Sequence, residues 1–191
     1  WLTRAGSHGE YEQKFLDEGR IFLTWDGLNQ DLSTLKSREL LLDLLENNYP
    51  NEKLKRLQNH SSQIWPFAKT MQVGDWVVLP SKKQPVIYVG EITSEYRHDK
   101  NAADPFYHSR KVKWFGQEIP RSNFGQDLLY SFGAFMTICR VRRNNALERL
   151  KSMSKNGWQP ENVKSAVQHS GQVNGTDIND VSTDDSFEFN L

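Results

Sequence analysis

The sequence sets an aromatic side chain beside a carboxylate at Trp25 and Asp26. A Trp at the end of a strand and beside a turn can form the wall of a ligand pocket. The adjacent carboxylate can accept a hydrogen bond from the exocyclic amine of cytosine or adenine. The alternative is a Trp packed on the end of a sheet and an Asp that only makes the turn with Gly27. These residues alone leave both interpretations open.

Basic side chains gather between residues 97 and 121, interleaved with Tyr96, Phe106 and Tyr107. This mixture suits contacts to phosphates beside contacts to bases. Lys111 and Lys113 alternate on one expected strand, so both would point to the same face. An ordinary solvated sheet face is the alternative. The residues expected to contact a nucleic-acid backbone are Arg97, His98, Arg110, Lys111, Lys113 and Arg121.

Catalytic and metal-binding interpretations find little in the sequence. Cys139 lies within an apolar run, which favours inert packing over a nucleophile. No Gly-rich phosphate loop opens a helix, and nothing pairs the carboxylates. We therefore expect no enzymatic activity, no metal and no cofactor. The histidines show no metal-ligand spacing; they are His8, His60, His98, His108 and His169.

The formal net charge of zero hides an asymmetry along the 191 residues. Residues 170–191 hold five acidic residues and no Lys or Arg, so residues 1–169 carry 24 basic and 19 acidic residues. A basic body with an acidic tail points towards a polyanionic partner. A further basic cluster, without an assigned role, comprises Arg140, Arg142 and Arg143.

The single cysteine excludes a disulfide within the chain and fits a reducing, cytoplasmic setting. No run approaches the length of a membrane span, and no signal peptide is visible, so we expect no membrane partner. Because the sequence begins with Trp rather than Met, we expect a trimmed chain, and an activity could lie outside it.

Short runs of β-branched and aromatic residues, bounded by Gly, Pro, Asn or Ser, predict strands. Their residue ranges are 1–4, 20–25, 76–79, 86–93, 110–115 and 135–141. Helical patterns cover residues 10–18, 37–46, 52–71, 124–130 and 145–153, with Ser37 as an N-cap and Pro66 at a kink. Strands so short and so interrupted by Gly predict an α+β fold, a small curved β-barrel with helices packed outside.

Several short motifs resemble the N-terminal module of predicted Mrr-type, modification-dependent restriction endonucleases. That module looks like a PUA-like barrel related to the EVE and YTH domains. The resemblance covers roughly residues 1–141, and no Mrr-type nuclease motif is present. The motifs are residues 1–6 (WLTRAG), Trp25, 63–67 (QIWPF), 73–75 (VGD), 88–92 (YVGEI), 110–114 (RKVKW) and 119–121 (IPR).

The resemblance implies a DNA-binding module that flips a modified base out of a duplex, with cleavage performed by a separate nuclease domain or subunit. The base would be methylated or hydroxymethylated cytosine, or methyladenine. The implied divisions are a base-binding domain (1–143), a helical extension (144–169) and an acidic tail or linker (170–191). The expected pocket residues are Ser7, His8, Trp25, Asp26, Trp65 and Tyr88.

Some of these assignments have structural alternatives. The loop with Ser7 and His8 could be a plain connection, Trp65 lies on an apolar helical stripe that favours the core, and the face taken by Tyr88 is open. At the level of function, two alternatives remain. One is an RNA-binding module of the same fold, and the other is a protein-interaction or small-ligand sensor domain.

Overall fold

A computed structural model describes residues 1–116 and 118–161, in which the short apolar runs form one mixed sheet. Among these residues the sheet has eight strands in the order β2-β6-β4-β3-β1-β8, with β5 paired to β6 and β7 paired to β4. β1 is parallel to β3, and the other pairings are antiparallel. The strands are β1 (Leu2–Thr3), β2 (Arg20–Leu23), β3 (Trp76–Pro80), β4 (Val86–Ile92), β5 (Arg97–His98), β6 (His108–Trp114), β7 (Ile119–Pro120) and β8 (Ile138–Cys139).

The fold is α+β, as the sequence predicts, but the sheet is open and the expectation of a barrel is wrong. In the described part of the chain, β2 and β8 end the strand path and do not pair with each other. The backbone N–H groups of Thr137 and Ile138 instead donate to Oε1 of Gln63, at 2.8 and 3.3 Å. A helical side chain thus satisfies hydrogen-bonding groups at the start of β8 that a closing strand would otherwise use.

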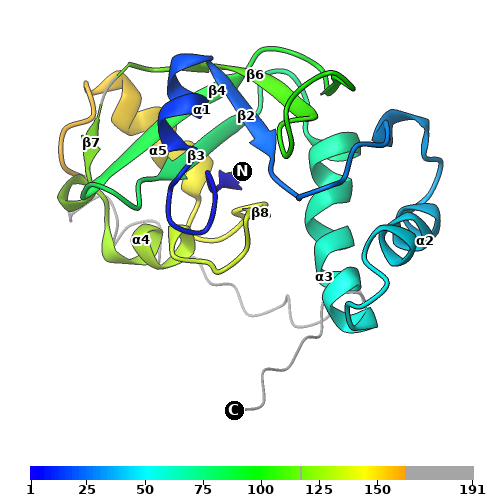
Figure 1. Cartoon of the computed structure of the whole chain (residues 1–191). Coiled ribbons are helices and arrows are strands. Elements are labelled where there is room, and N and C mark those ends of the chain that lie inside the picture. The colour runs from blue at the N-terminus through cyan, green and yellow to red at the C-terminus, as the bar shows by residue number, and fades with distance from the viewer. Residues whose placement is uncertain (117, 162–191) are drawn as a thin grey trace.

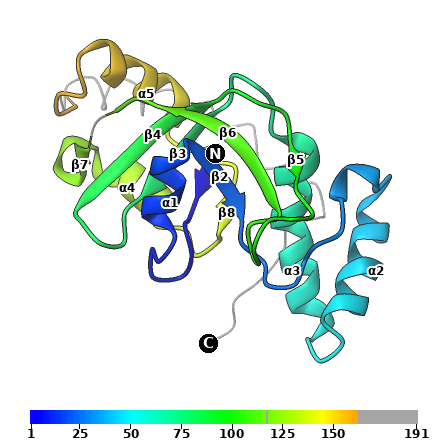
Figure 2. The same ribbon diagram turned by 45° about the horizontal axis from the view of Figure 1, so that its top comes forward.

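Helices cover the sheet on two sides (Figure 1). In Figures 1 and 2, α2 and α3 lie together beside one end of the sheet, whereas α4 and α5 lie at the other. The helices are α1 (Glu12–Asp17), α2 (Arg38–Asn48), α3 (Leu54–Trp65), α4 (Gln126–Phe132) and α5 (Ala146–Lys155), with shorter turns η1 (Leu32–Thr34), η2 (Pro66–Thr70) and η3 (Arg121–Asn123).

The buried side chains form two clusters, one on each face of the sheet. Val77 belongs to the first cluster and Val78 to the second, as the continuous apolar run of β3 predicts for a strand covered on both faces. The first cluster also takes in Leu41, Leu57 and other residues of α2 and α3. The second contains residues of α4 and α5, so α5 packs into the same body as the central strands.

Local signals place α2 and α3 correctly. Ser37 caps α2, with its Oγ accepting from the backbone N–H of Leu40, and the predicted cap is confirmed. Pro66 marks the change from α3 to the wider π-helical turn η2, because its ring excludes a regular α-helical hydrogen bond at that point.

The last predicted strand, residues 135–141, is shorter than expected. Only Ile138 and Cys139 form β8, and Phe135 is fully exposed. The guanidinium of Arg4 donates to the carbonyl oxygens of Phe132 and Ala134, so the chain is held in a turn before the strand begins. The expected acidic tail (170–191), residues 162–169 and Gln117 lie outside the described residues. Within the described ranges, no helix is long and apolar enough to cross a membrane.

Candidate nucleic-acid interface

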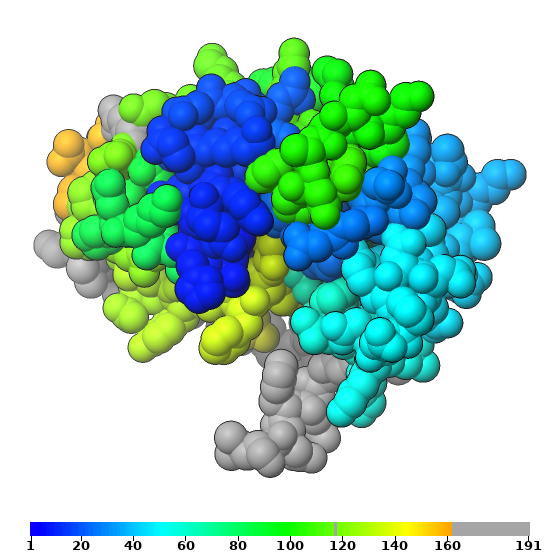
Figure 3. Space-filling model, viewed as in Figure 1, coloured from blue at the N-terminus to red at the C-terminus, as the bar shows by residue number. Residues whose placement is uncertain are grey.

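The turn that follows β2 holds Trp25 and Asp26, and its backbone is fixed from outside. The hydroxyl of Tyr49 donates to the carbonyl oxygen of Asp26 at 2.8 Å. The N–H of Gly27, whose φ is +72°, donates to Oδ1 of Asp104 at 2.8 Å. Burial and the nearby carboxylates raise the pKa of Tyr49 to about 12, so its hydroxyl remains a donor at neutral pH. Figure 3 shows the loops that carry these groups adjoining on one face of the molecule.

A buried histidine holds the other end of the turn. His108 is fully buried on β6, and its Nε2 lies 2.7 Å from the carbonyl oxygen of Leu28. Because a carbonyl only accepts, Nε2 carries the proton, and Nδ1 accepts from the hydroxyl of Tyr96 at 2.7 Å. That hydroxyl in turn accepts from the backbone N–H of Leu32 at 3.1 Å. Burial lowers the pKa of His108 to about 4, which keeps this neutral form at physiological pH.

Trp25 is half-buried, and its ring meets the ring of His60 edge-on, with centroids 5.6 Å apart. The Nδ1 atom of His60 is buried and has no hydrogen-bond partner in the described structure. Burial lowers the pKa of this imidazole. Asp26, by contrast, is exposed, and its carboxylate makes no hydrogen bond within the described residues. The turn therefore presents a half-buried ring and an uncommitted carboxylate, and the ring packs against an imidazole of α3 whose Nδ1 is buried.

Sequence reasoning missed His60 as a site residue. It lies one helical turn before Gln63, and both interrupt the apolar face of α3 with polar groups. A polar residue on a packed face usually has a specific partner. Polar residues on the apolar face of a helix are therefore the sequence signal that could have identified His60.

The loop with Ser7 and His8 is exposed and lies near the β3–β4 hairpin. Ser7 Oγ and His8 Nδ1 are 3.2 Å apart, and the His8 N–H donates to Glu10. The start of α1 is tied to the hairpin through Glu12, whose carboxylate accepts from the Ser81 hydroxyl at 2.8 Å. Neither Ser7 nor His8 hydrogen-bonds to the Trp25 turn in the described structure.

The remaining predicted pocket residues lie elsewhere. Trp65 is half-buried against the first cluster, with the ammonium group of Lys69 5.7 Å from its ring centroid, which supports the core interpretation. The hydroxyl of Tyr88 on β4 donates to Glu118 at 3.2 Å. Burial and Glu118 raise the pKa of Tyr88 to about 12. The structure thus brings Trp25 and Asp26 together but does not connect the other four residues to them through a hydrogen bond or ring contact.

Part of the expected backbone-contacting set lies along β5 and β6. Lys111 and Lys113 are both exposed on one face of β6, as alternation predicts. The register places Arg20 opposite Lys111, so this face gains a cation that the prediction omitted. On β5, the guanidinium of Arg97 lies 3.5 Å from the carboxylate of Asp99. His98 Nε2 lies 2.8 Å from the carbonyl oxygen of Asn29. Four predicted residues therefore share this region.

The expectation that Arg110 contacts phosphate is wrong for this structure. Its side chain is 1% exposed, and its guanidinium donates to the carbonyl oxygens of Phe67 at 2.8 Å and Ala68 at 3.3 Å. Strand alternation gives the reason, because Arg110 shares the inward face of β6 with Val112. Arg121 is exposed but lies apart, donating to the carbonyl oxygen of Ser81 at 2.6 Å.

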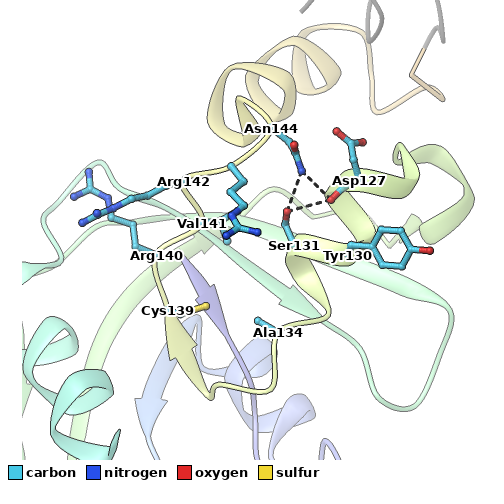
Figure 4. Close-up of a pocket in the computed structure, with 10 residues that line it drawn as sticks. Asp127, Tyr130, Ser131, Ala134, Cys139, Arg140, Val141, Arg142 and Asn144 are labelled. Atoms are coloured by element: carbon cyan, nitrogen blue, oxygen red, sulfur yellow. Dashed lines mark hydrogen bonds between the residues drawn. The ribbon is translucent and has the colours of Figure 1, made fainter. Parts of the chain in front are cut away.

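Two cavities of the structure lie away from the predicted pocket residues. One, of about 600 Å³, lies between α4 and the segment after β8 (Figure 4). Another, of about 480 Å³, lies on the other side of that segment and reaches Trp1 and Trp76. Both cavities share Arg140, Val141 and Arg142. None of the six predicted pocket residues lines either one. The described residues contain no cluster of His, Cys, Asp or Glu suited to a metal ion.

These features define an α+β module built on an open mixed sheet, with a fixed Trp-Asp turn, a basic sheet face and arginine-lined cavities. Residues 1–129 match the model of a family described as "Domain of unknown function (DUF8426)". The match spans about two thirds of the chain, which therefore belongs to this family. No curated protein and no solved structure matches the chain.

Proposed function

We propose that the chain is a DNA-binding module that reads a modified base, flipped out of a duplex, and gives a modification-dependent restriction system its specificity. The proposal includes a PUA-like relationship to the EVE and YTH domains, which rests on the sequence motifs. The observation that carries it is the Trp25 turn, which is fixed by its neighbours yet leaves the Asp26 carboxylate exposed and uncommitted.

The rigidity of the turn supports a binding role. A binding segment whose backbone is already fixed avoids part of the ordering cost that a mobile segment would incur when a ligand binds. Tyr49 and His108 donate hydrogen bonds to the carbonyl oxygens of Asp26 and Leu28. The Gly27 N–H donates to Asp104. These bonds fix the backbone of the turn before any ligand arrives. A buried polar network is stabilising only when its members are satisfied, and the Tyr96–His108 pair meets that condition.

The chemistry of the turn suits a nucleobase. Trp25 offers an aromatic surface, and stacking on such a surface contributes about 1–3 kcal/mol per base. Asp26 is exposed and can accept a hydrogen bond from an exocyclic amine. The cations on the outer face of β6, Lys111 and Lys113, would contact phosphates. Cleavage would belong to a nuclease domain or subunit outside this chain.

The variant Asp26→Asn tests the proposal most cleanly. Its side chain makes no hydrogen bond in the described structure, so folding should be unaffected. We expect a loss of discrimination between modified and unmodified duplexes of about tenfold, equivalent to about 1.4 kcal/mol. Asp43→Asn, at an exposed position on α2, is the matched control. If the two variants discriminate as well as the parent protein, Asp26 does not read the base.

A further inference from the structure

The segment after β8 carries three exposed arginines between the two cavities. Figure 4 shows Arg140 and Arg142 extending to the same side of the segment, away from α4, with Asp127, Tyr130 and Asn144 on the opposite side. Like charges placed side by side repel one another, so the arrangement is favourable only where anions or water screen it. Because many of the lining side chains are exposed, the site is an open trough rather than a closed pocket.

Other arginines of this fold have internal partners. Arg4 and Arg110 donate to backbone carbonyl oxygens, and Arg149 donates to two carboxylates. Arg142 and Arg143, by contrast, make no hydrogen bond or ion pair through their side chains within the described residues. Their guanidinium groups therefore contribute no evident support to the fold.

Arg140 has an aromatic partner rather than an anionic one. Its guanidinium carbon lies 5.6 Å from the ring centroid of Trp1. This contact orients the group over an aromatic surface, and within residues 1–116 and 118–161 its charge has no carboxylate partner.

The acidic residue of the larger cavity is paired with an arginine that it shares with a second carboxylate. Asp127 accepts from both terminal nitrogens of Arg149, at 2.6 and 3.0 Å, and Arg149 also donates to Glu161 at 2.6 and 2.7 Å. The hydrogen bonds from Arg149 lower the pKa of Asp127, and Glu161 raises the pKa of Arg149. The carboxylate thus stays ionised but paired. Three arginines and this one paired carboxylate line the larger cavity, which keeps its lining positive, whereas Asp75 and Glu148 also line the smaller cavity.

Hydrogen bonds fix the far end of the segment in place. The side-chain amide of Asn144 donates to the carbonyl oxygen of Asp127 at 3.0 Å and to the hydroxyl of Ser131 at 3.2 Å. Arg149 donates to the Asn144 carbonyl oxygen at 3.2 Å. At the other end, β8 pairs with β1. The arginines therefore project from a backbone that is anchored at both ends.

We propose that residues 140–143 form a phosphate-contacting surface for the sugar-phosphate backbone of the nucleic acid. The inference rests on the proposed function and adds a surface that lies apart from the Trp25 turn. An open trough with three exposed arginines, two of which have no partner within the described residues, suits an extended chain of phosphodiesters. Tyr130, which is 74% exposed at the edge of the trough, offers an additional surface to a sugar or base.

The test compares the parent protein with Arg142→Ala/Arg143→Ala in fluorescence anisotropy titrations of a labelled duplex. The duplex is prepared with and without 5-methylcytosine, 5-hydroxymethylcytosine or N6-methyladenine, and the salt concentration is varied. Lys53→Ala/Lys55→Ala, at exposed positions at the start of α3, is the matched control for two lost charges. Arg142→Lys/Arg143→Lys keeps the charges, and circular dichroism with thermal unfolding checks that every variant folds.

The alanine pair should weaken binding to all the duplexes by the same factor, about tenfold or more at low salt. It should also reduce the slope of log K against log salt by about 1.8, since each lost phosphate contact removes about 0.9. The lysine pair should retain most of the slope. An alanine pair that behaves like the Lys53/Lys55 control, or that alters only the preference among bases, would overturn this inference and leave the proposed function standing. A parent protein that binds no duplex would overturn both.

Discussion

Replacing Tyr96 with Phe removes one hydroxyl at the centre of the network that holds the Trp25 turn. The change keeps the ring, which stacks on His108 with centroids 5.8 Å apart. It leaves two partners unsatisfied, namely Nδ1 of His108 and the backbone N–H of Leu32. Both residues are almost completely buried, at 0% and 1% exposure, so water cannot readily replace the lost hydroxyl.

The expected cost follows from those two groups. Each buried group left without a partner costs about 1–3 kcal/mol, so Tyr96→Phe should lower the free energy of unfolding by about 2–6 kcal/mol. Tyr107→Phe is the matched control, because it lies on the same segment and its hydroxyl makes no hydrogen bond in the described structure. That control should change stability by no more than about 0.5 kcal/mol.

Urea unfolding at pH 7.5, followed by tryptophan fluorescence, measures both variants, and equal m values are required for the comparison. Amide hydrogen exchange should also become faster at Leu32 in Tyr96→Phe, because its N–H loses its acceptor. The reasoning fails if Tyr96→Phe and Tyr107→Phe have the same stability. It also fails if stability falls while exchange at Leu32 stays as slow as in the parent protein.

Further predictions concern the groups around this network and the sheet edge. Because burial lowers the pKa of His108 from 6.5 to about 4, the unfolded chain takes up the proton first. The free energy of unfolding should therefore fall by up to about 1.4 kcal/mol per pH unit as the pH drops from 6.5 to 4. In urea titrations across this range, His108→Gln should lose this pH-dependent part of the stability. Gln63→Leu should cost about 1–3 kcal/mol in chemical unfolding because it deprives the Thr137 and Ile138 N–H groups of their acceptor; an unchanged midpoint would argue against the edge role of Gln63. Trp25→Ala should abolish discrimination among modified duplexes, and Trp25→Phe, which keeps a ring, should retain part of it; equal discrimination by the parent and the Ala variant would remove Trp25 from the site.

The sequence predicts the parts of the fold that depend on local patterns. The strands at β3, β4 and β6, the Ser37 cap and the break at Pro66 follow from side-chain periodicity and backbone chemistry within a few residues. The inward position of Arg110 was also available from alternation, since it has the same parity as Val112, but its charge favoured a surface role. Burial of that guanidinium is possible because backbone carbonyl oxygens satisfy it.

Contacts between distant segments could not be predicted in this way. Trp25 meets His60 across 35 positions, and His108 reaches Leu28 across 80. The open edge of the sheet likewise depends on Gln63, which lies 74 positions before Thr137. The smaller cavity combines Trp1, residues 75–76 and residues from the segment after β8, so a list of motifs could not reveal that Arg140 and Arg142 line both cavities.

The most direct test of the proposed function is a binding titration with short duplexes that are identical except at one base. The base is unmodified cytosine or adenine, 5-methylcytosine, 5-hydroxymethylcytosine or N6-methyladenine, and each duplex is measured at two salt concentrations. We predict a preference of tenfold or more for one modified duplex, or about 1.4 kcal/mol, which persists at both salt concentrations. Equal affinity for all the duplexes, or no binding to any of them, would contradict the proposal that this chain reads a modified base.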